Sequence, residues 1–308
     1  MHYIKLNKDT FISKIGIGSY RNFGEKLDPR ESRKIILNFF EQGINFIDSS
    51  VNYADGDCEK IIGNILKNNN LRKSFFIASK VFFSVNKKIN DGLSRKNIKF
   101  SIDKIKQNYQ TDYIDCVQCH RYDPNQNLHE LVEIFESYIN NGDIRYWGTT
   151  NWPYDKINKI IKICKMKNRF IFNQMPINIF YKKNKKSLLL LKKKNFINII
   201  YGVLAKGLLT NNFIMKKKTF KNNENINYNK ENITLIKKLF IVCKKYDYSL
   251  EEFMYSLINS QKYVDVTLCG VGMYQHFKNL NFKKILNKKL FENNIYKIKK
   301  YEKIKDLL

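Results

Sequence analysis

Apolar residues along the chain follow two alternating patterns. Short, nearly continuous apolar runs, typical of strands buried on both faces, alternate with longer segments in which apolar residues recur every three or four positions. Eight runs are candidate strands: 14–18, 44–48, 75–80, 113–119, 145–149, 170–174, 197–202 and 264–269. Helical spacing is clearest in residues 35–40, 131–138 and 157–164. Strands that alternate with helices predict a parallel sheet covered by helices.

The order of these elements predicts one closed barrel. Eight strands with intervening helices and no long linker are typical of a (β/α)8 TIM barrel, and 308 residues suit such a barrel as one domain. We therefore expect a single domain over residues 1–308. Residues 2–13 alternate apolar and polar positions around a polar turn, which predicts an N-terminal β-hairpin. The first helix should begin at Asp28, whose carboxylate can cap it, with Pro29 at its first position.

Hydropathy and cysteine usage exclude several classes of protein. No apolar run approaches the roughly 20 residues needed to span a bilayer, and the first ten residues lack the apolar segment of a signal peptide. We therefore expect a cytoplasmic protein with no membrane insertion. The six cysteines are scattered in apolar surroundings and should be reduced thiols. Cys116 and Cys119 have a CxxC spacing, but within a strand they point to opposite faces, so we expect neither a redox pair nor a metal site.

The formal net charge of +28 raises the question of an anionic partner. Of the 56 basic residues only eight are arginines, although arginine is the residue favoured for bidentate contacts to phosphates and bases. The lysines are spread over positions that should be solvated. Specific nucleic-acid binding is therefore not expected, but the positive field can favour an anionic substrate.

Ionisable side chains lie at equivalent ends of three consecutive candidate strands. Asp48 ends one strand, Lys80 ends the next, and His120 directly follows a third. In a parallel barrel the carboxyl ends of the strands form one rim, so these side chains should converge there, and buried Asp48 needs a cation such as Lys80. Tyr53 lies in the loop after Asp48. The set predicts an active site in which an ion pair makes Tyr53 a stronger acid, although each residue alone also suits a helix cap, a surface or a packing role.

The ordered set of these residues resembles the aldo-keto reductase family. The resemblance extends over roughly residues 11–285. It rests on Phe46-Ile47-Asp48, Tyr53, Glu59, Ile62-Gly63, Lys80, Tyr113-Ile114-Asp115 and His120. Residues 92–98, 120–125 and 145–152 are most similar to the branch that contains the beta subunits of voltage-gated potassium channels and their bacterial relatives. The resemblance implies a nicotinamide-dependent oxidoreductase for a small carbonyl or alcohol substrate. A cofactor-binding regulatory subunit that senses redox state, with little turnover, is the alternative, and an oligomer is compatible with both.

The same resemblance implies roles for four residues. Tyr53 would be the general acid in carbonyl reduction and the general base in the reverse reaction, and Lys80 would lower the pKa of its phenol. Asp48 would hold Lys80 charged and in place. Neutral His120 would orient the carbonyl oxygen by a hydrogen bond. Because this position can be Asn in the channel-subunit branch, His120 favours an ordinary reductase.

Further positions of the family pattern imply a cofactor site. They are Gly18, Ser19, Tyr20, Asp48, Thr150, Asn151, Gln174, Tyr201, Gly202, Val203, Leu204, Ala205, Gly207, Gly270, Gly272, His276 and Asn279. Thr150, Asn151 and Gln174 match contacts to the nicotinamide carboxamide, and Tyr201 matches the ring stacked under the nicotinamide. NADP(H) is the family default. NAD(H) is the open alternative, because residues expected to bind a 2′-phosphate depart from the pattern and the positive charge would have to come from Lys206, His276 or Lys278.

Aromatic residues in the expected rim loops suggest an apolar substrate pocket, with core packing as the alternative for each. They are Tyr20, Phe82, Phe83, Tyr122 and Trp152. Residues 211–230 form a long Lys/Asn-rich segment that is either a flap over the cofactor or an insertion. Residues 283–308 should form a Lys-rich helix against the barrel wall. Sugars, sugar derivatives and simple aldehydes remain open as substrates.

Overall fold

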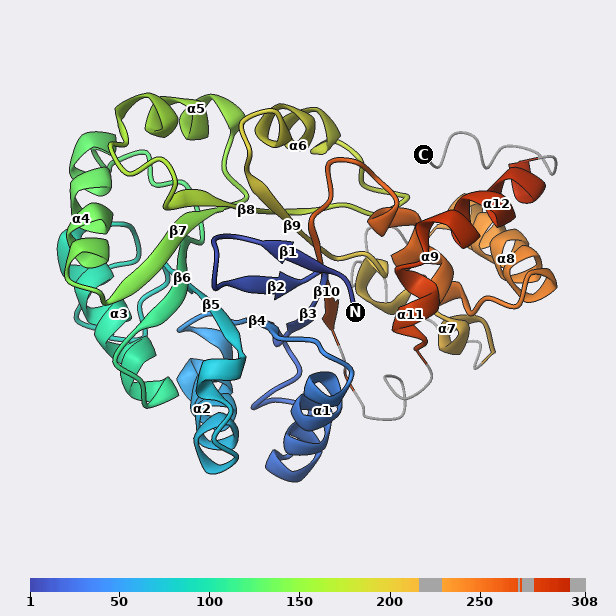
Figure 1. The fold of residues 1–308 in the computed structure, drawn as a ribbon, viewed down its shortest axis with the longest axis horizontal. Helices are drawn as coiled ribbons and strands as arrows, with labels where there is room; N and C mark the ends of the chain where they lie inside the picture. The colour runs from blue at the N-terminus through green and yellow to red at the C-terminus, as the bar shows by residue number, and fades with distance from the viewer. Residues whose placement is uncertain (216–228, 271, 273–279, 300–308) are drawn as a thin grey trace.

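A closed barrel of eight parallel strands forms the centre of the computed structural model, which describes residues 1–215, 229–270, 272 and 280–299 (Figure 1). The strands are β3 Ile15–Gly18, β4 Phe46–Asp48, β5 Phe76–Val81, β6 Ile114–Cys119, β7 Ile144–Thr150, β8 Phe170–Pro176, β9 Ile197–Tyr201 and β10 Val266–Gly270. They follow one another in sequence around the barrel, and β10 closes it against β3. All eight predicted strands are present with small shifts at their ends, so the predicted (β/α)8 TIM barrel is confirmed.

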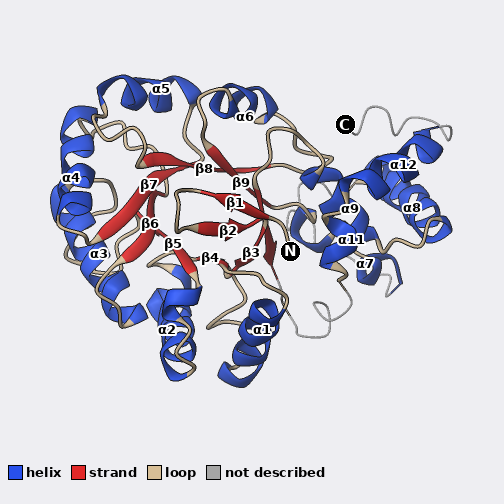
Figure 2. Ribbon diagram, in the orientation of Figure 1, coloured by secondary structure: helices blue, strands red, loops and turns tan. Residues whose placement is uncertain are grey.

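Helices cover the outside of the barrel (Figure 2). Those that follow β3 to β8 are α1 Pro29–Glu41, α2 Asp57–Asn68, α3 Arg95–Tyr109, α4 Leu128–Asn140, α5 Tyr154–Ile163 and α6 Lys185–Lys192. After β9 come α7 Asn211–Met215, α8 Lys230–Lys245 and α9 Leu250–Asn259, and after β10 come α11 Phe282–Ile285 and α12 Lys288–Lys299. As predicted, α1 begins after Asp28, whose carboxylate accepts the Glu31 N–H at 2.7 Å. Most of the predicted segment 211–230 lies outside the described residues.

The N-terminal hairpin covers one end of the barrel. β1 (Tyr3–Lys5) pairs antiparallel with β2 (Phe11–Ser13), which confirms the predicted hairpin, and the pair lies across the centre of the barrel in Figure 1. Ile12 belongs to the apolar cluster that fills the barrel, and Ile4 and Leu6 pack against it. The rings of this cluster are Phe46, Phe76, Tyr146 and Phe172. Because the interior is packed and this end is covered, the rim at the carboxyl ends of the strands is where a site can form.

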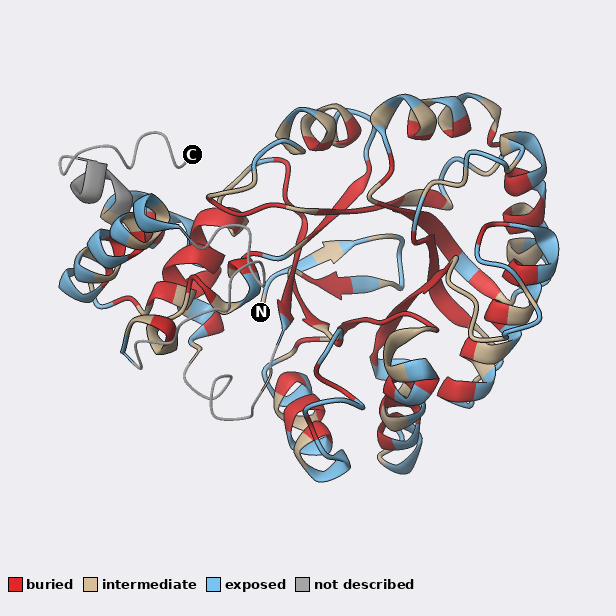
Figure 3. Cartoon of the chain, turned by 180° about the vertical axis from the view of Figure 1, so that it is seen from behind, coloured by how far each residue is buried: buried red, intermediate tan, exposed pale blue. Residues whose placement is uncertain are grey.

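A second, larger apolar core lies between the barrel and its helices (Figure 3). Cys119 belongs to this outer core and Cys116 to the barrel interior, so the two point to opposite faces of β6 as predicted. All six cysteines are buried and unpaired. Within the described residues, no helix is both long enough and apolar enough to cross a bilayer.

A clamp of charged residues joins three strands at the end opposite the rim. Asp115 of β6 accepts hydrogen bonds from Arg72 at 3.0 Å and from Arg145 of β7 at 3.1 Å. Its carboxylate also accepts the Ile77 N–H of β5 at 3.0 Å. The two guanidinium carbons lie 4.4 and 4.1 Å from the ring centre of Tyr113. Asp115, one of the residues behind the family resemblance, is thus part of the fold's framework.

Candidate active site

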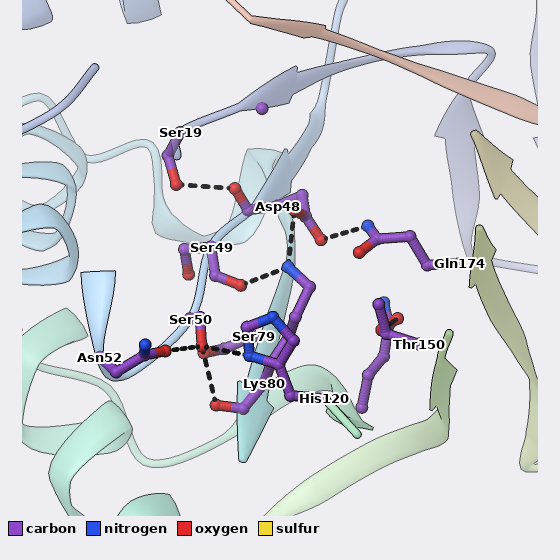
Figure 4. Close-up of polar contacts among 12 residues, drawn as sticks. Ser19, Asp48, Ser49, Ser50, Asn52, Ser79, Lys80, His120, Thr150 and Gln174 are labelled. Carbon is purple, nitrogen blue, oxygen red and sulfur yellow. Dashed lines mark hydrogen bonds and ion pairs between the residues drawn. The ribbon is translucent and has the colours of Figure 1, made fainter. Parts of the chain in front are cut away.

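The four predicted catalytic side chains lie together at the carboxyl end of the barrel. Asp48 is the last residue of β4, Lys80 lies near the end of β5, and His120 directly follows β6 (Figure 4). Tyr53 opens the short 3-10 helix η1 (Tyr53–Gly56) after β4. Its ring centre is 5.2 Å from the Lys80 ammonium and 6.0 Å from the centre of the His120 ring. The convergence expected from the strand ends is therefore present.

Asp48 and Lys80 form a buried ion pair. The Lys80 Nζ lies 2.7 Å from Asp48 Oδ2 and also donates to the Ser49 carbonyl oxygen at 2.7 Å. The other Asp48 oxygen accepts from Gln174 Nε2 at 2.7 Å, so a predicted cofactor residue also holds the catalytic carboxylate (Figure 4). Burial raises the pKa of Asp48, whereas the Lys80 ammonium and the Gln174 amide act in the opposite direction. Both charges are thus desolvated but paired.

The acidity of Tyr53 differs from the expectation. Burial raises the pKa of the Tyr53 phenol well above its usual value of about 10, and the Asp48 carboxylate adds to the rise. The prediction that the pKa of Tyr53 lies below its usual value is wrong in this structure, because desolvation of the phenol dominates and the Lys80 ammonium donates to Asp48 and Ser49. Tyr53 therefore stays protonated at neutral pH, which is the form that can donate a proton.

His120 is neutral, as predicted. Burial, with the positive charges of Lys80 and Arg121, lowers its pKa to about 2. Its Nδ1 lies 3.2 Å from Ser50 Oγ, which in turn lies 2.6 Å from Asn52 Oδ1 (Figure 4). When the Ser50 hydroxyl donates to Nδ1, the ring proton is on Nε2; when it donates to Asn52, the proton is on Nδ1. The direction of the Ser50 hydrogen bonds is thus coupled to the tautomer of His120, a link that the sequence did not indicate.

We expect His120 to make the protein sensitive to mild acid. Its pKa is about 2 in the folded protein and about 6.5 in the unfolded chain. Below about pH 6.5 the unfolded state therefore binds more protons than the folded state, and the free energy of unfolding decreases as the pH is lowered. The slope from one histidine is at most about 1.4 kcal/mol per pH unit. Urea unfolding at about pH 7, 6 and 5 should show a weaker pH dependence for His120→Asn than for the native chain. Equal pH dependence in both proteins would contradict the buried, neutral state.

A buried glutamate supports the two strand ends that carry the ion pair. Glu59 of α2 is fully buried, and its Oε1 accepts the hydroxyls of Ser49 at 3.0 Å and Ser79 at 2.5 Å. Its Oε2 accepts Asn108 Nδ2 at 3.2 Å. Burial raises the pKa of Glu59, while the three donors act in the opposite direction. Each of the two serines is the sequence neighbour of a member of the ion pair, so Glu59 ties β4 to β5 beside the site. The resemblance included Glu59 but implied no role for it.

Polar side chains at the predicted cofactor positions are largely bonded within the protein. Ser19 donates to the Asp48 carbonyl oxygen at 2.8 Å, and Thr150 donates to Gln118 Oε1 at 2.7 Å. The Tyr201 hydroxyl donates to Asn151 Oδ1 at 2.8 Å. Within the described residues, Asn151 Nδ2 and Gln174 Oε1 have no hydrogen bond. One donor and one acceptor at neighbouring strand ends are thus left without a protein partner among the described residues, which fits the acceptor and donor of a carboxamide.

The loop after β9 has an unusual backbone. Gly202, Ala205, Lys206 and Gly207 have φ angles of 72°, 46°, 58° and 90°, all in the left-handed region. Such turns gather backbone N–H groups into concavities that bind anions. Lys206 is exposed, Val203 is buried, and no described residue lies within 4 Å of the position that a Cβ would take at Gly207. The N–H groups of Ala205 and Gly207 donate within the loop. The features that suit a phosphate group are therefore the remaining N–H groups of this left-handed turn and the exposed Lys206 cation.

The loops after β3 and β10 meet across the barrel closure. Asn22, which the sequence did not single out, is buried, and its amide atoms lie 3.6 and 3.5 Å from the positions that a Cβ would take at Gly270 and Gly272. A side chain at either glycine would thus contact this amide. The predicted cofactor residues His276 and Asn279, and Lys278, lie outside the described residues.

Aromatic rings flank the catalytic side chains. The ring centres are 4.9 Å apart in Tyr20–Tyr53, 5.2 Å in Phe83–His120, 5.1 Å in Phe82–Phe83 and 5.0 Å in Tyr122–Trp152. Tyr20 is 55% exposed, so it can contact a ligand at the rim. Trp152 is only 2% exposed, and its indole N–H donates to the Cys119 carbonyl oxygen at 3.1 Å. Trp152 therefore packs beneath Tyr122 and presents little surface to a substrate.

A model of the Aldo/keto reductase family matches residues 14–302 of the chain. The match spans all eight barrel strands and the rim loops that carry Asp48, Tyr53, Lys80 and His120. It does not distinguish branches within the family. The similarity to potassium-channel beta subunits and their bacterial relatives therefore stays a prediction.

Proposed function

Because this chain belongs to the aldo/keto reductase family, whose members carry out NAD(P)H-dependent oxidoreduction of carbonyl compounds, we propose that it reduces a small aldehyde or ketone with Tyr53 as the proton donor. The observation that carries this proposal is the meeting of Tyr53, His120 and the Asp48–Lys80 ion pair at the carboxyl rim of the barrel. We propose one domain for the whole chain, and a cytoplasmic site of action because all six cysteines are unpaired.

The proposed chemistry depends on where protons lie at the rim. A carbonyl oxygen between Tyr53 and His120 would accept a hydrogen bond from the protonated phenol. In the tautomer in which Ser50 donates to Nδ1, His120 Nε2 would donate a second hydrogen bond to the same oxygen. When bound, a reduced nicotinamide supplies the hydride that the carbonyl carbon accepts. As the oxygen gains negative charge it becomes more basic than a phenolate, so Tyr53 can protonate it despite its raised pKa. The Lys80 ammonium, 5.2 Å from the phenol ring centre, then stabilises the phenolate that forms.

The proposed cofactor site consists of two side-chain amides, an aromatic ring and a left-handed loop, all at the rim. Asn151 and Gln174 would bind the carboxamide, and Tyr201, held by its hydrogen bond to Asn151, would stack under the ring. The left-handed loop at 202–207 would bind the diphosphate. We propose NADP(H) as the preferred cofactor because Lys206 places a positive charge in this loop, with NAD(H) as the alternative.

Binding and turnover can be measured in sequence. Trp152 follows β7 at the rim, so we expect nucleotide binding to quench the intrinsic fluorescence. The titration should show a higher affinity for NADPH than for NADH. We also expect at least one carbonyl compound to oxidise bound NADPH. The assay would follow nicotinamide absorbance with a panel of aldehydes, ketones and sugars. Tight binding without turnover would contradict the reductase and favour a regulatory subunit that senses the redox state of its cofactor. No binding of either nucleotide would contradict both functions.

A further inference from the structure

Arg121 is a cation beside the site that the proposed mechanism does not use. It follows His120 directly, is exposed, and donates from Nη1 to the His120 carbonyl oxygen at 3.0 Å. Its guanidinium carbon lies 5.9 Å from the ring centre of Phe83, and this ring lies 5.2 Å from the His120 ring. Phe83 therefore lies beside both the guanidinium and the His120 imidazole.

The charge of Arg121 acts across the rim. It lowers the pKa of His120 and opposes the rise that burial causes in the pKa of Tyr201. His120 follows β6, whereas Tyr201 ends β9, and β7 and β8 lie between these strands in the barrel. The guanidinium thus lies within electrostatic range of groups on both sides of the rim.

Arg121 has no carboxylate partner in the part of the chain that the structure describes. Among the described residues it takes part in no ion pair. Asp48 is paired with Lys80. Asp123, two positions further along the chain, accepts the backbone N–H groups of Leu93 at 2.8 Å and Asn125 at 2.9 Å. An unpaired guanidinium with free Nε and Nη2 donors is suited to a planar anion.

We propose that Arg121 binds an anionic group, a carboxylate or a phosphate, that the substrate carries a few bonds from its carbonyl. This inference rests on the proposed reductase function and specifies its substrate class: short aldehydes or ketones with an acidic group. Phe83 contacts both the guanidinium and His120 and so sets the spacing between the proposed anion site and the carbonyl site. A second exposed arginine, Arg21, lies 5.3 Å from the Tyr20 ring and adds to the positive field at the mouth.

The test compares matched substrates in two charge-matched variants. Arg121→Gln removes the proposed anion contact, and Arg169→Gln removes the same charge at the start of β8, at the opposite end of the barrel, where Arg169 lies 5.3 Å from the Tyr146 ring. Substrates are 4-carboxybenzaldehyde and its neutral analogue 4-formylbenzamide, and glyceraldehyde 3-phosphate and glyceraldehyde. In Arg121→Gln, kcat/KM for the charged member of one pair should fall about tenfold to a hundredfold, mainly through KM. Values for the neutral members, and all values for Arg169→Gln, should stay within about twofold.

Several results would overturn the inference. Equal losses for charged and neutral substrates would mean that Arg121 acts only by positioning His120. A weaker NADPH affinity in Arg121→Gln, without a change in substrate preference, would assign Arg121 to the cofactor phosphates. The native protein could also fail to reduce any carbonyl compound, which would reject the proposed function. Calorimetric titration of the NADPH-loaded protein with 4-methylbenzoate would then still decide the anion site: binding lost in Arg121→Gln supports it, and no binding to the native protein overturns it.

Discussion

Replacing Tyr53 by Phe should remove nearly all turnover and leave cofactor binding intact. General acid catalysis typically contributes about 10²- to 10⁴-fold to a rate, so kcat should fall by about a thousandfold. The change removes only the hydroxyl, and the ring can keep its packing against Tyr20, 4.9 Å away, and against His120, 6.0 Å away. Steady-state kinetics and a fluorescence titration with NADPH measure the two effects separately.

A second tyrosine provides a matched control for this experiment. Tyr138→Phe makes the same chemical change on α4, on the outside of the barrel, and should leave kcat unchanged. Undiminished turnover in Tyr53→Phe would reject Tyr53 as the proton donor. Loss of NADPH binding in Tyr53→Phe would show instead that the hydroxyl supports the structure of the cofactor site.

Replacing Lys80 by Met should both inactivate and destabilise the protein. The Asp48 carboxylate, 4% exposed, would stay buried with the Gln174 amide as its remaining side-chain donor among the described residues. Breaking a buried ion pair by removing one partner typically costs about 3–5 kcal/mol, so the free energy of unfolding should fall by about this amount. Urea unfolding near neutral pH measures the loss, and the same preparation can be assayed for turnover.

A double variant separates the effect of the unpaired charge from the effect of the lost lysine side chain. Asp48→Asn combined with Lys80→Met removes both charges and should recover much of the stability, because no carboxylate is left buried without a cation. Turnover should not return, since the ammonium beside Tyr53 is still absent. If the double variant is as unstable as Lys80→Met, the instability comes from lost packing or from the contact to Ser49, and the ion-pair explanation is incorrect.

The barrel and the position of the site could be predicted because both follow from local patterns. Apolar runs that end in Asp48 and Lys80, and a run followed by His120, are readable in a single sequence, and parallel strands bring their carboxyl ends together. The hairpin and the beginning of the first helix are equally local, since each depends on a turn or on one capping residue.

Other features depend on distances that a linear sequence does not contain. The pKa of Tyr53 depends on how deeply its phenol is buried and on which groups the Lys80 ammonium contacts, and these effects raised the pKa instead of lowering it. Serines carry no pattern that would reveal Ser49 and Ser79 as donors to Glu59. The left-handed conformations of Ala205 and Lys206 are similarly hidden, because neither residue type favours them.

The clamp around Asp115 has a consequence for the opposite end of the barrel, because strand register is common to both ends. The pairing of β5 with β6 that puts Asp115 within reach of Arg72 also sets Lys80 opposite Gln118. A slip of one residue would move β6 by about 3.3 Å and turn its side chains to the other face. A barrel with this register shift would lose both ion pairs of Asp115. The clamp therefore fixes the register of β5, β6 and β7, and the spacing of the catalytic groups at the rim depends on contacts at the opposite end of the barrel.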